Sequence, residues 1–208
     1  MSLMTRFMNM SRKPKGFLGA LMLSRMNGGR HARLADWSMG VYQGNPAEIL
    51  DIGCGGGRNL SAFLRRYPDA HGTGVDYSPL SVRTSAAKNR AAISAGRCRV
   101  LEANALSLPL PDNHFDLVTA FETVYFWTTL EDGFREVYRV LRPGGTFMIV
   151  NELDGRNGIG EQYEKIIKRM RTYTGEDLEA ALKFCGFPRV RVIRHNNLMW
   201  MCVMAGKI

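Results

Sequence analysis

The sequence predicts an α/β protein with a doubly wound, mostly parallel sheet and an antiparallel strand near the carboxyl terminus. From Glu48 onward, short apolar runs alternate with segments in which apolar residues recur every three or four positions. This alternation implies right-handed crossovers, and therefore parallel strands with helices on both faces of the sheet. Near the end of the chain, two apolar runs flank Asn196 and Asn197. So short a connection can only join antiparallel strands.

Strands are expected where short apolar runs lie between turn residues. In chain order these runs are Glu48–Ile52, His71–Val75, Arg99–Ala103, Phe115–Phe121, Thr146–Val150, Val190–Arg194 and Leu198–Met204. The last two form the predicted hairpin, with a tight turn at Asn196-Asn197 because asparagine tolerates positive φ.

Helices are expected between the strands. After the first strand, Leu60, Phe63, Leu64 and Tyr67 share one helical face. The pair Ser78-Pro79 supplies an N-cap and a first-turn proline for the next helix. Further helices are predicted from Thr129 to Pro143, from about Gly160 to Arg171, and from Thr174 to Gly186.

The chain has 208 residues and a formal net charge of +9, of which residues 1–40 carry +6. A basic amino-terminal arm can meet an anionic substrate, nucleic acid or a membrane surface, or can simply favour solubility. No apolar run approaches the roughly 18 residues of a membrane-spanning helix, so no membrane span is expected. The four cysteines show no C-x-x-C pair and no metal-ligand spacing. This pattern predicts reduced thiols, a cytoplasmic protein and no metal site.

Four glycines stand within five positions in the stretch ILDIGCGGGRNL, between the first strand and the first turn of a helix. Glycine lets the backbone approach a ligand closely, and the helix amino terminus presents free N–H groups. In an open α/β sheet, ligands bind outside the carboxyl ends of the strands. The glycines Gly53, Gly55 and Gly57 do not complete a dinucleotide fingerprint, because Arg58 occupies the position of its third glycine. They therefore indicate a ligand of another kind, or a structural turn.

Polar residues also end the second and third strands. Asp76 lies 23 residues past Gly53, where a carboxylate can accept hydrogen bonds from two ribose hydroxyls. The alternative is an aspartate that caps a helix or ends a loop. Asn104 and the N–H of Ala105 are placed to read an adenine edge, with Leu106 or Leu108 over the ring.

The stretches ILDIGCGGG, GVDYS, EANALSLPLPDNHFDLVTAFE and EVYRVLRPGGTFMIV stand in an order and spacing that resembles class I S-adenosylmethionine-dependent methyltransferases. They look most like the small-molecule "methyltransferase type 11" group, over residues 47–208. The resemblance implies a seven-stranded Rossmann-like methyltransferase fold with an antiparallel last strand, S-adenosylmethionine as cofactor and a small-molecule acceptor.

The resemblance also implies roles for individual residues. The methionyl part of the cofactor would lie against the glycines, the ribose hydroxyls against Asp76, and the adenine against Tyr77 and Asn104. Asn104 departs from the family's usual aspartate, although its carbonyl can still accept from an amine. The implied cofactor-binding residues are Asp51, Gly53, Cys54, Gly55, Gly57, Asp76, Tyr77, Asn104, Ala105 and Phe121.

Three residues are candidates for catalysis on the acceptor side: Glu122, Tyr125 and His31. Methyl transfer is an in-line displacement that depends largely on proximity, and a base is needed only for an acceptor with a proton of high pKa. The alternative is that Glu122 orients the cofactor while Tyr125 belongs to a wall or the core. His114 precedes the fourth strand, at the wrong end for catalysis, and is expected to be exposed.

Residues 1–46 are expected to form a helical segment in front of the methyltransferase domain at 47–208. Seven of the twelve methionines precede residue 40, and Gly28-Gly29 interrupts the helical pattern. Flexible methionines suit an adaptable cover over the acceptor pocket, with the cofactor contacts lying outside the segment. The alternatives are a helix packed on the sheet edge and the contact surface of a homodimer.

Two other functions remain open at this stage. A nicotinamide-dependent oxidoreductase shares the strand, glycines, helix and acid, but the missing third glycine and the terminal hairpin count against it. A cofactor-binding or RNA-associated module without catalysis could use the basic arm. Nucleic-acid binding is not favoured, because no platform of aromatic and basic residues is visible.

Overall fold

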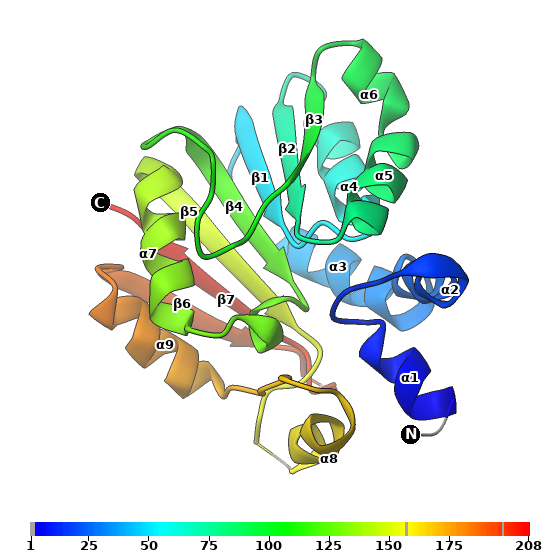
Figure 1. Ribbon diagram of the computed structural model, residues 1–208. Helices are drawn as coiled ribbons and strands as arrows, with labels where there is room; N and C mark the ends of the chain where they lie inside the picture. Colours follow the sequence, from blue (N-terminus) through cyan, green and yellow to red (C-terminus); the bar gives the residue numbers. More distant parts are fainter. Residues whose placement is uncertain (1–2, 157, 197) are drawn as a thin grey trace.

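The computed structural model describes residues 3–156, 158–196 and 198–208. Its centre is a seven-stranded sheet with the order β3-β2-β1-β4-β5-β7-β6 (Figure 1). The strands are β1 (Glu48–Ile52), β2 (His71–Asp76), β3 (Cys98–Glu102), β4 (Phe115–Phe121), β5 (Leu141–Asn151), β6 (Arg189–Arg194) and β7 (Met201–Gly206). β7 is antiparallel to both of its neighbours, and the other pairs are parallel. The predicted fold is confirmed, antiparallel last strand included.

Helices cover both faces of this sheet. They are α1 (Leu3–Asn9), α2 (Gly16–Met26), α3 (Gly29–Val41), α4 (Arg58–Arg66), α5 (Pro79–Lys88), α6 (Arg90–Ser94), α7 (Leu130–Val140), α8 (Ile159–Ile166) and α9 (Gly175–Phe184), with a 3₁₀ turn at Val124–Phe126. None of the helices in the described part of the chain is long and apolar enough to cross a membrane.

Adjacent residues of each central strand point to opposite faces, which divides the core in two. Val118 of β4 packs in one apolar cluster with Phe134 of α7 and Leu182 of α9. Leu117, one residue earlier, packs in a second cluster with Leu34 of α3. Because β4 is apolar at both positions and lies inside the sheet, it contributes to the core on both faces.

Local sequence explains several of the helix boundaries. The Ser78 side chain accepts a hydrogen bond from the Ser81 N–H, and Pro79 occupies the first turn of α5. At the start of α9, Thr174 and Asp177 form a reciprocal capping box. Each satisfies N–H groups that the first turn leaves unpaired. These helices therefore begin at the residues that the sequence indicates.

Several boundaries differ from the predictions; β7, for example, spans Met201–Gly206 where Leu198–Met204 was expected, and α7 ends at Val140. β5 begins at Leu141 instead of Thr146, because Leu141 pairs with Phe115 before a register shift. α8 ends at Ile166, five residues before the expected Arg171. The connection between β6 and β7 spans 195–200 and is not a tight turn; it is closed by the His195 N–H on the Trp200 carbonyl at 2.9 Å. Asn197 of the predicted turn lies outside the described residues.

The amino-terminal segment is helical, as predicted, and lies beside the carboxyl ends of β1, β2 and β4 (Figure 1). Leu34, Ala35 and Met39 of α3 are buried in the same cluster as residues of the sheet. A division into a separate segment at 1–46 and a domain at 47–208 stays a prediction, and α3 is packed as part of the core.

Candidate functional site

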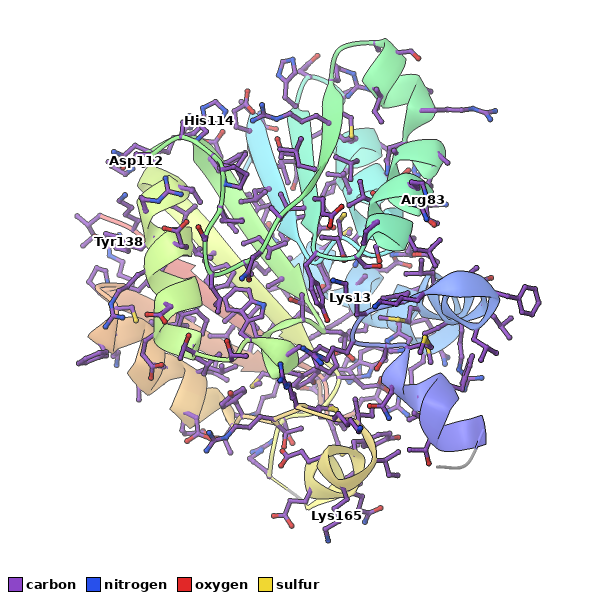
Figure 2. All side chains as sticks on the ribbon, in the orientation of Figure 1. Lys13, Arg83, Asp112, His114, Tyr138 and Lys165 are labelled. Atoms are coloured by element: carbon purple, nitrogen blue, oxygen red, sulfur yellow. The ribbon has the colours of Figure 1, made fainter. Side chains whose placement is uncertain are left out.

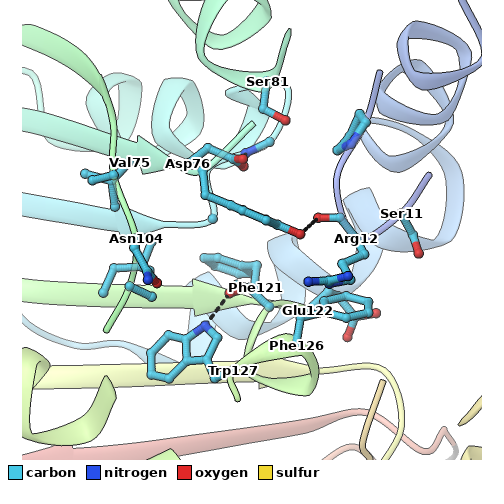
Figure 3. A pocket seen from close by; sticks show the side chains of 18 of the residues that line it. Ser11, Arg12, Val75, Asp76, Ser81, Asn104, Phe121, Glu122, Phe126 and Trp127 are labelled. Carbon is cyan, nitrogen blue, oxygen red and sulfur yellow. Dashed lines mark hydrogen bonds between the residues drawn. The ribbon is translucent and has the colours of Figure 1, made fainter. Parts of the chain in front are cut away.

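A cavity of about 270 Å³ opens at the carboxyl ends of β1, β2 and β4 (Figure 3). Its wall contains most of the residues that the sequence singled out for cofactor binding and one catalytic candidate. These are Gly53, Gly55, Asp76, Tyr77, Asn104, Ala105, Phe121 and Glu122. Three of the four motif stretches, which are separated in the sequence, therefore meet around one space.

The glycine loop shapes the floor of this cavity. Gly53 and Gly55 adopt left-handed backbone, with φ of 71° and 51°. A Cβ on Gly55 would point towards Leu23 in the opposite wall, whose nearest atom lies 3.8 Å away. A Cβ on Gly53 would instead press on the Thr123 side chain at 2.8 Å. Both glycines allow the backbone itself to form the surface that a ligand meets.

The next two glycines also make room for contacts within the protein, and the expectation that the whole run lies against the cofactor stays a prediction. A Cβ on Gly56 would lie 2.0 Å from the side-chain amide of Asn27 in the amino-terminal segment. A Cβ on Gly57 would lie 2.5 Å from the Ser85 hydroxyl of α5. The run is thus dense because three surfaces approach it: the cavity, the amino-terminal segment and a neighbouring helix.

Asp76 connects the second strand to the glycine loop. Its Oδ2 accepts from the Gly55 N–H at 3.0 Å, and its Oδ1 accepts from the Ser78 N–H at 2.8 Å. Burial raises the pKa of this carboxyl, while the two backbone N–H groups oppose the shift. The capping role and the cofactor role can coexist, because each carboxylate oxygen retains a further lone pair towards the cavity.

Tyr77 and Asn104 line the part of the cavity assigned to adenine. The Tyr77 hydroxyl donates to the Arg12 carbonyl at 2.6 Å, and Lys13 lies over one face of its ring, 4.9 Å from the centroid. Asn104 Oδ1 accepts from the Leu106 N–H at 3.1 Å. Each side chain is therefore fixed by a neighbour and still presents a surface to the cavity.

Three predicted cofactor residues lie outside the lining: Asp51, Cys54 and Gly57. Asp51 is buried in β1 and accepts a hydrogen bond from the Thr119 hydroxyl at 2.8 Å. Burial raises its pKa to about 7. Cys54 is also buried, and burial raises the pKa of its thiol. The roles of Asp51, Cys54 and Gly57 in cofactor binding stay predictions. Asp51 and Cys54 are buried next to the glycines that line the cavity.

Glu122, directly after β4, is the catalytic candidate that reaches the cavity. It holds a positive φ of 60°, which is rare for a residue with a side chain. Burial and the neighbouring Glu152 carboxylate raise its pKa to about 8. Tyr125 does not line the cavity. Its hydroxyl lies 3.3 Å from Glu122 Oε1 and accepts from the Leu153 N–H at 3.0 Å, so it supports Glu122 from behind.

His31 lies behind Glu122, outside the cavity wall, together with a residue that the sequence analysis missed. His31 Nδ1 is 3.8 Å from a carboxylate oxygen of Glu122 and 3.8 Å from one of Glu152. Burial lowers the His31 pKa, although Glu152 works in the other direction. Glu152 also pairs with Arg30. The available signal was its place directly after β5, which ends at the same edge as β4.

The amino-terminal segment supplies a second part of the wall that sequence reasoning missed. Ser11, Arg12, Pro14, Leu23 and Met26 all line the cavity. The Pro14 carbonyl accepts from the buried Ser78 hydroxyl at 2.8 Å, which attaches the segment to the cofactor motifs. The segment was expected to cover only the acceptor, and the structure places it over the cofactor motifs as well.

His114 lies at the amino end of β4, far from the cavity, as predicted. Figure 2 shows it at the opposite end of the strands from Lys13, which belongs to the segment beside the cavity. Its side chain is 38% exposed and faces Glu48 at 3.4 Å.

Comparisons with known proteins agree with this geometry. Residues 50–149 match the family described as "Methyltransferase domain". Sterol 24-C-methyltransferase erg-4 of Neurospora crassa is 29% identical over 77% of this chain and 46% of its own length. A ubiquinone/menaquinone biosynthesis C-methyltransferase of Dinoroseobacter shibae is 31% identical over 62% of this chain and 52% of its own. The chain thus spans about half the length of these relatives.

Solved structures show the same fold. A SAM-dependent methyltransferase from Aquifex aeolicus superposes with a TM-score of 0.73 at 19% identity, covering 88% of this chain and 95% of its own. The matched family and the terminal hairpin do not favour the nicotinamide-dependent alternative. The matched family identifies residues 50–149 as a methyltransferase domain, and the sheet order is that of the class I S-adenosylmethionine-dependent methyltransferase fold.

Proposed function

We propose that this protein transfers a methyl group from S-adenosylmethionine to a small-molecule acceptor that binds beside Glu122. The observation that carries this proposal is the convergence of Gly55, Asp76, Asn104 and Glu122 on one cavity. The first three belong to the cofactor motifs. Glu122 lies at the end of β4, on the side where an acceptor would approach.

The residues present fit the cofactor chemically. The left-handed backbone at Gly53 and Gly55 leaves space for the methionyl chain, and Asp76 has lone pairs for ribose hydroxyls. Tyr77 and Asn104 stand where the adenine would lie. When bound, the cofactor supplies an activated methyl group. The protein's contribution is to hold acceptor and methyl group in line, which by itself accounts for a large part of the catalysis.

Glu122, Tyr125 and His31 form the acceptor side of this proposal. Tyr125 positions the Glu122 carboxylate through its hydroxyl, and His31 lies against the other carboxylate oxygen. A carboxylate in this place can accept a hydrogen bond from a hydroxyl or amine of the acceptor and so orient it. Tyr125 is thus a positioning residue, and Glu122 is the one that reaches the cavity.

The walls favour an acceptor with a substantial apolar part. Leu23, Met26, Phe126 and Trp127 line the cavity alongside the polar motif residues. The curated relatives are named for a sterol and for ubiquinone and menaquinone biosynthesis, which are consistent with an apolar acceptor. Since those proteins are about twice as long, the acceptor of this chain is a class to be tested and not a name carried over.

Two measurements test the function. Calorimetric titration with S-adenosylhomocysteine should show saturable binding, and titration with NAD should show none. Incubating the protein and a cell extract with methyl-labelled cofactor should place label in a small molecule that partitions into organic solvent. Binding of NAD without a response to S-adenosylhomocysteine would overturn the proposal. Label found only in RNA or protein would overturn the small-molecule part of it.

A cytoplasmic location and a homodimer belong to the same proposal. The four cysteines are unpaired and buried, as suits a reducing compartment. On α2, Phe17 and Leu21 are one helical turn apart and are 85% and 51% exposed, so they offer an apolar contact for a second copy. Sedimentation of Phe17→Ser beside the wild type would detect a dimer that uses this face.

A further inference from the structure

We infer that His31, Glu122 and Glu152 bind a divalent transition-metal cation. One donor atom from each residue, a His31 nitrogen and one oxygen from each carboxylate, all lie within 4.8 Å of one another. The residues come from three separate elements: the first turn of α3, the position after β4 and the position after β5. We call them the His-Glu-Glu cluster.

The distances within the cluster suit a cation better than direct contact. His31 Nδ1 lies 3.8 Å from Glu122 Oε2 and 3.8 Å from Glu152 Oε2, which is too long for a hydrogen bond. Metal–ligand bonds of about 2.0–2.2 Å place neighbouring ligand atoms roughly 3–4 Å apart. Moreover, Nδ1 is buried and has no hydrogen-bond partner in the described structure. A buried polar atom without a partner lowers the stability of the folded protein unless a ligand binds it.

Each carboxylate is held through its other oxygen. Glu122 Oε1 accepts from the Glu152 N–H and from the Tyr125 hydroxyl, while Glu152 Oε1 pairs with Arg30. The two Oε2 atoms are thereby left facing His31. Contacts of this kind, one step outside the ligands, orient the ligands in metal sites and raise affinity.

The donor set selects the class of cation. One imidazole nitrogen with two carboxylate oxygens suits Zn²⁺, Mn²⁺ or Fe²⁺, whereas Ca²⁺ and Mg²⁺ prefer oxygen ligands alone. The three side chains are 17–32% exposed, so water or an acceptor group can complete the coordination. Because Glu122 lines the cavity, the cation would lie at the acceptor side. Only this role in catalysis rests on the proposed function; binding of the cation does not.

Titration of the full chain with Mn²⁺ tests the site. The concentration of free Mn²⁺ is measured by electron paramagnetic resonance. We expect one Mn²⁺ per chain, displaced by Zn²⁺. Glu152→Gln and His31→Ala should each weaken Mn²⁺ binding by about 10- to 100-fold or more. His114→Ala is the matched control, because that histidine faces Glu48 at the opposite end of the sheet. It should leave Mn²⁺ affinity unchanged.

The proposal is overturned if the wild type shows no saturable Mn²⁺ or Zn²⁺ binding. It is equally overturned if Glu152→Gln binds like the wild type, or if His114→Ala loses the ion instead. Titration of the same samples with S-adenosylhomocysteine shows that each variant is folded. That titration also separates the two proposals, because a wild-type protein that binds S-adenosylhomocysteine but no metal ion would refute the metal site alone.

Discussion

The two ends of the central strand β4 carry the same kinds of residue in different surroundings. At the amino end, His114 faces Glu48 at 3.4 Å and is 38% exposed. At the carboxyl end, His31 faces both Glu122 and Glu152, and its Nδ1 is buried. The two histidine side chains are similarly exposed, at 38% and 32%, so the difference lies in the buried Nδ1 of His31, which water does not reach. The comparison indicates that burial of the histidine nitrogen, and not residue type, distinguishes the proposed metal cluster from a surface contact.

The fold explains why only one end is enclosed. The carboxyl ends of the parallel strands gather the glycine loop and the acids that follow β2, β4 and β5. The amino-terminal segment then covers this end, with α2 and the residues before it in the cavity wall. A substitution near the cavity can therefore be compared with a similar substitution away from it. If the cavity is the functional site, only the first should affect ligand binding.

The largest effect is expected from Gly55→Val. Gly55 and Leu23 both line the cavity, and a Cβ on Gly55 would lie 3.8 Å from Leu23, so the branched side chain would take up space between them and binding of S-adenosylhomocysteine should fall below detection in calorimetry. Gly144→Val is the matched control at the other end of the sheet. Gly144 also has a positive φ, of 81°, but a Cβ there meets nothing within 4 Å. Both variants should lose about 1–3 kcal/mol of stability to backbone strain. Normal binding by Gly55→Val would show that the loop does not meet the cofactor.

Asp76→Ala should weaken S-adenosylhomocysteine binding by about 10- to 100-fold, because hydrogen bonds to a charged group contribute roughly 1.5–3 kcal/mol. The variant also leaves the Gly55 and Ser78 N–H groups without an acceptor, so its melting temperature should drop. Asp112→Ala, at the exposed end, removes only a surface pair with Arg139 and should change affinity less than twofold. Equal affinities for the two variants would remove Asp76 from the site.

A smaller effect, on stability, is expected from the pH dependence of Asp51. Burial raises its pKa from 3.8 to about 7 in the folded state. Between about pH 4 and pH 7, Asp51 is therefore protonated in the folded protein and ionised in the unfolded chain. The free energy that Asp51 contributes to folding is complete below about pH 4 and is lost as the pH rises through 7. Relative to Asp51→Asn, the wild type should lose unfolding free energy between pH 5 and pH 8, by at most about 1.4 kcal/mol per pH unit.

Chemical denaturation at several pH values measures this difference. Asp116→Asn supplies the contrast from the amino half of the sheet. Asp116 is buried too, but it pairs with Arg142 and accepts from the N–H groups of Ala47 and Glu48. Its substitution should lower the unfolding free energy, because it removes the ion pair with Arg142 and a charged acceptor of two backbone N–H groups, while the pH dependence that Asp51 contributes should remain. If the unfolding free energies of the wild type and Asp51→Asn changed with pH in parallel, the raised pKa of Asp51 would be contradicted.

The smallest effect is expected from Tyr77→Phe. The change removes the hydroxyl that donates to the Arg12 carbonyl and so loosens the amino-terminal segment over the cavity. One such bond contributes about 0.5–1.5 kcal/mol, so the dissociation rate of S-adenosylhomocysteine should rise about two- to tenfold in a stopped-flow measurement. Tyr138→Phe, whose ring lies under Lys207 on the far side, should leave the rate unchanged. An unaltered rate in Tyr77→Phe would mean that this contact does not hold the cavity closed.

The central fold could be predicted from the sequence because apolar periodicity and helix caps involve residues that are close together in the chain. β4 was predicted at the residues where it is found, and the caps at Ser78 and Thr174 begin helices as expected. The motif residues of the cavity could be read as well, since parallel strands bring their carboxyl ends to one edge. The extent of β5 could not, because pairing of Leu141 with Phe115 is a contact between distant parts of the chain.

The sequence by itself determined the fold class, the family motifs and the edge of the sheet at which they act, because periodicity, caps and glycine spacing act over a few residues. Only the tertiary structure decided that Asn27 lies against Gly56, that Arg12 holds Tyr77, and that Glu152 joins His31. These contacts join residues far apart in the chain, and no local pattern encodes their distances. They form only when the amino-terminal segment packs against the sheet, as Leu34, Ala35 and Met39 of α3 do.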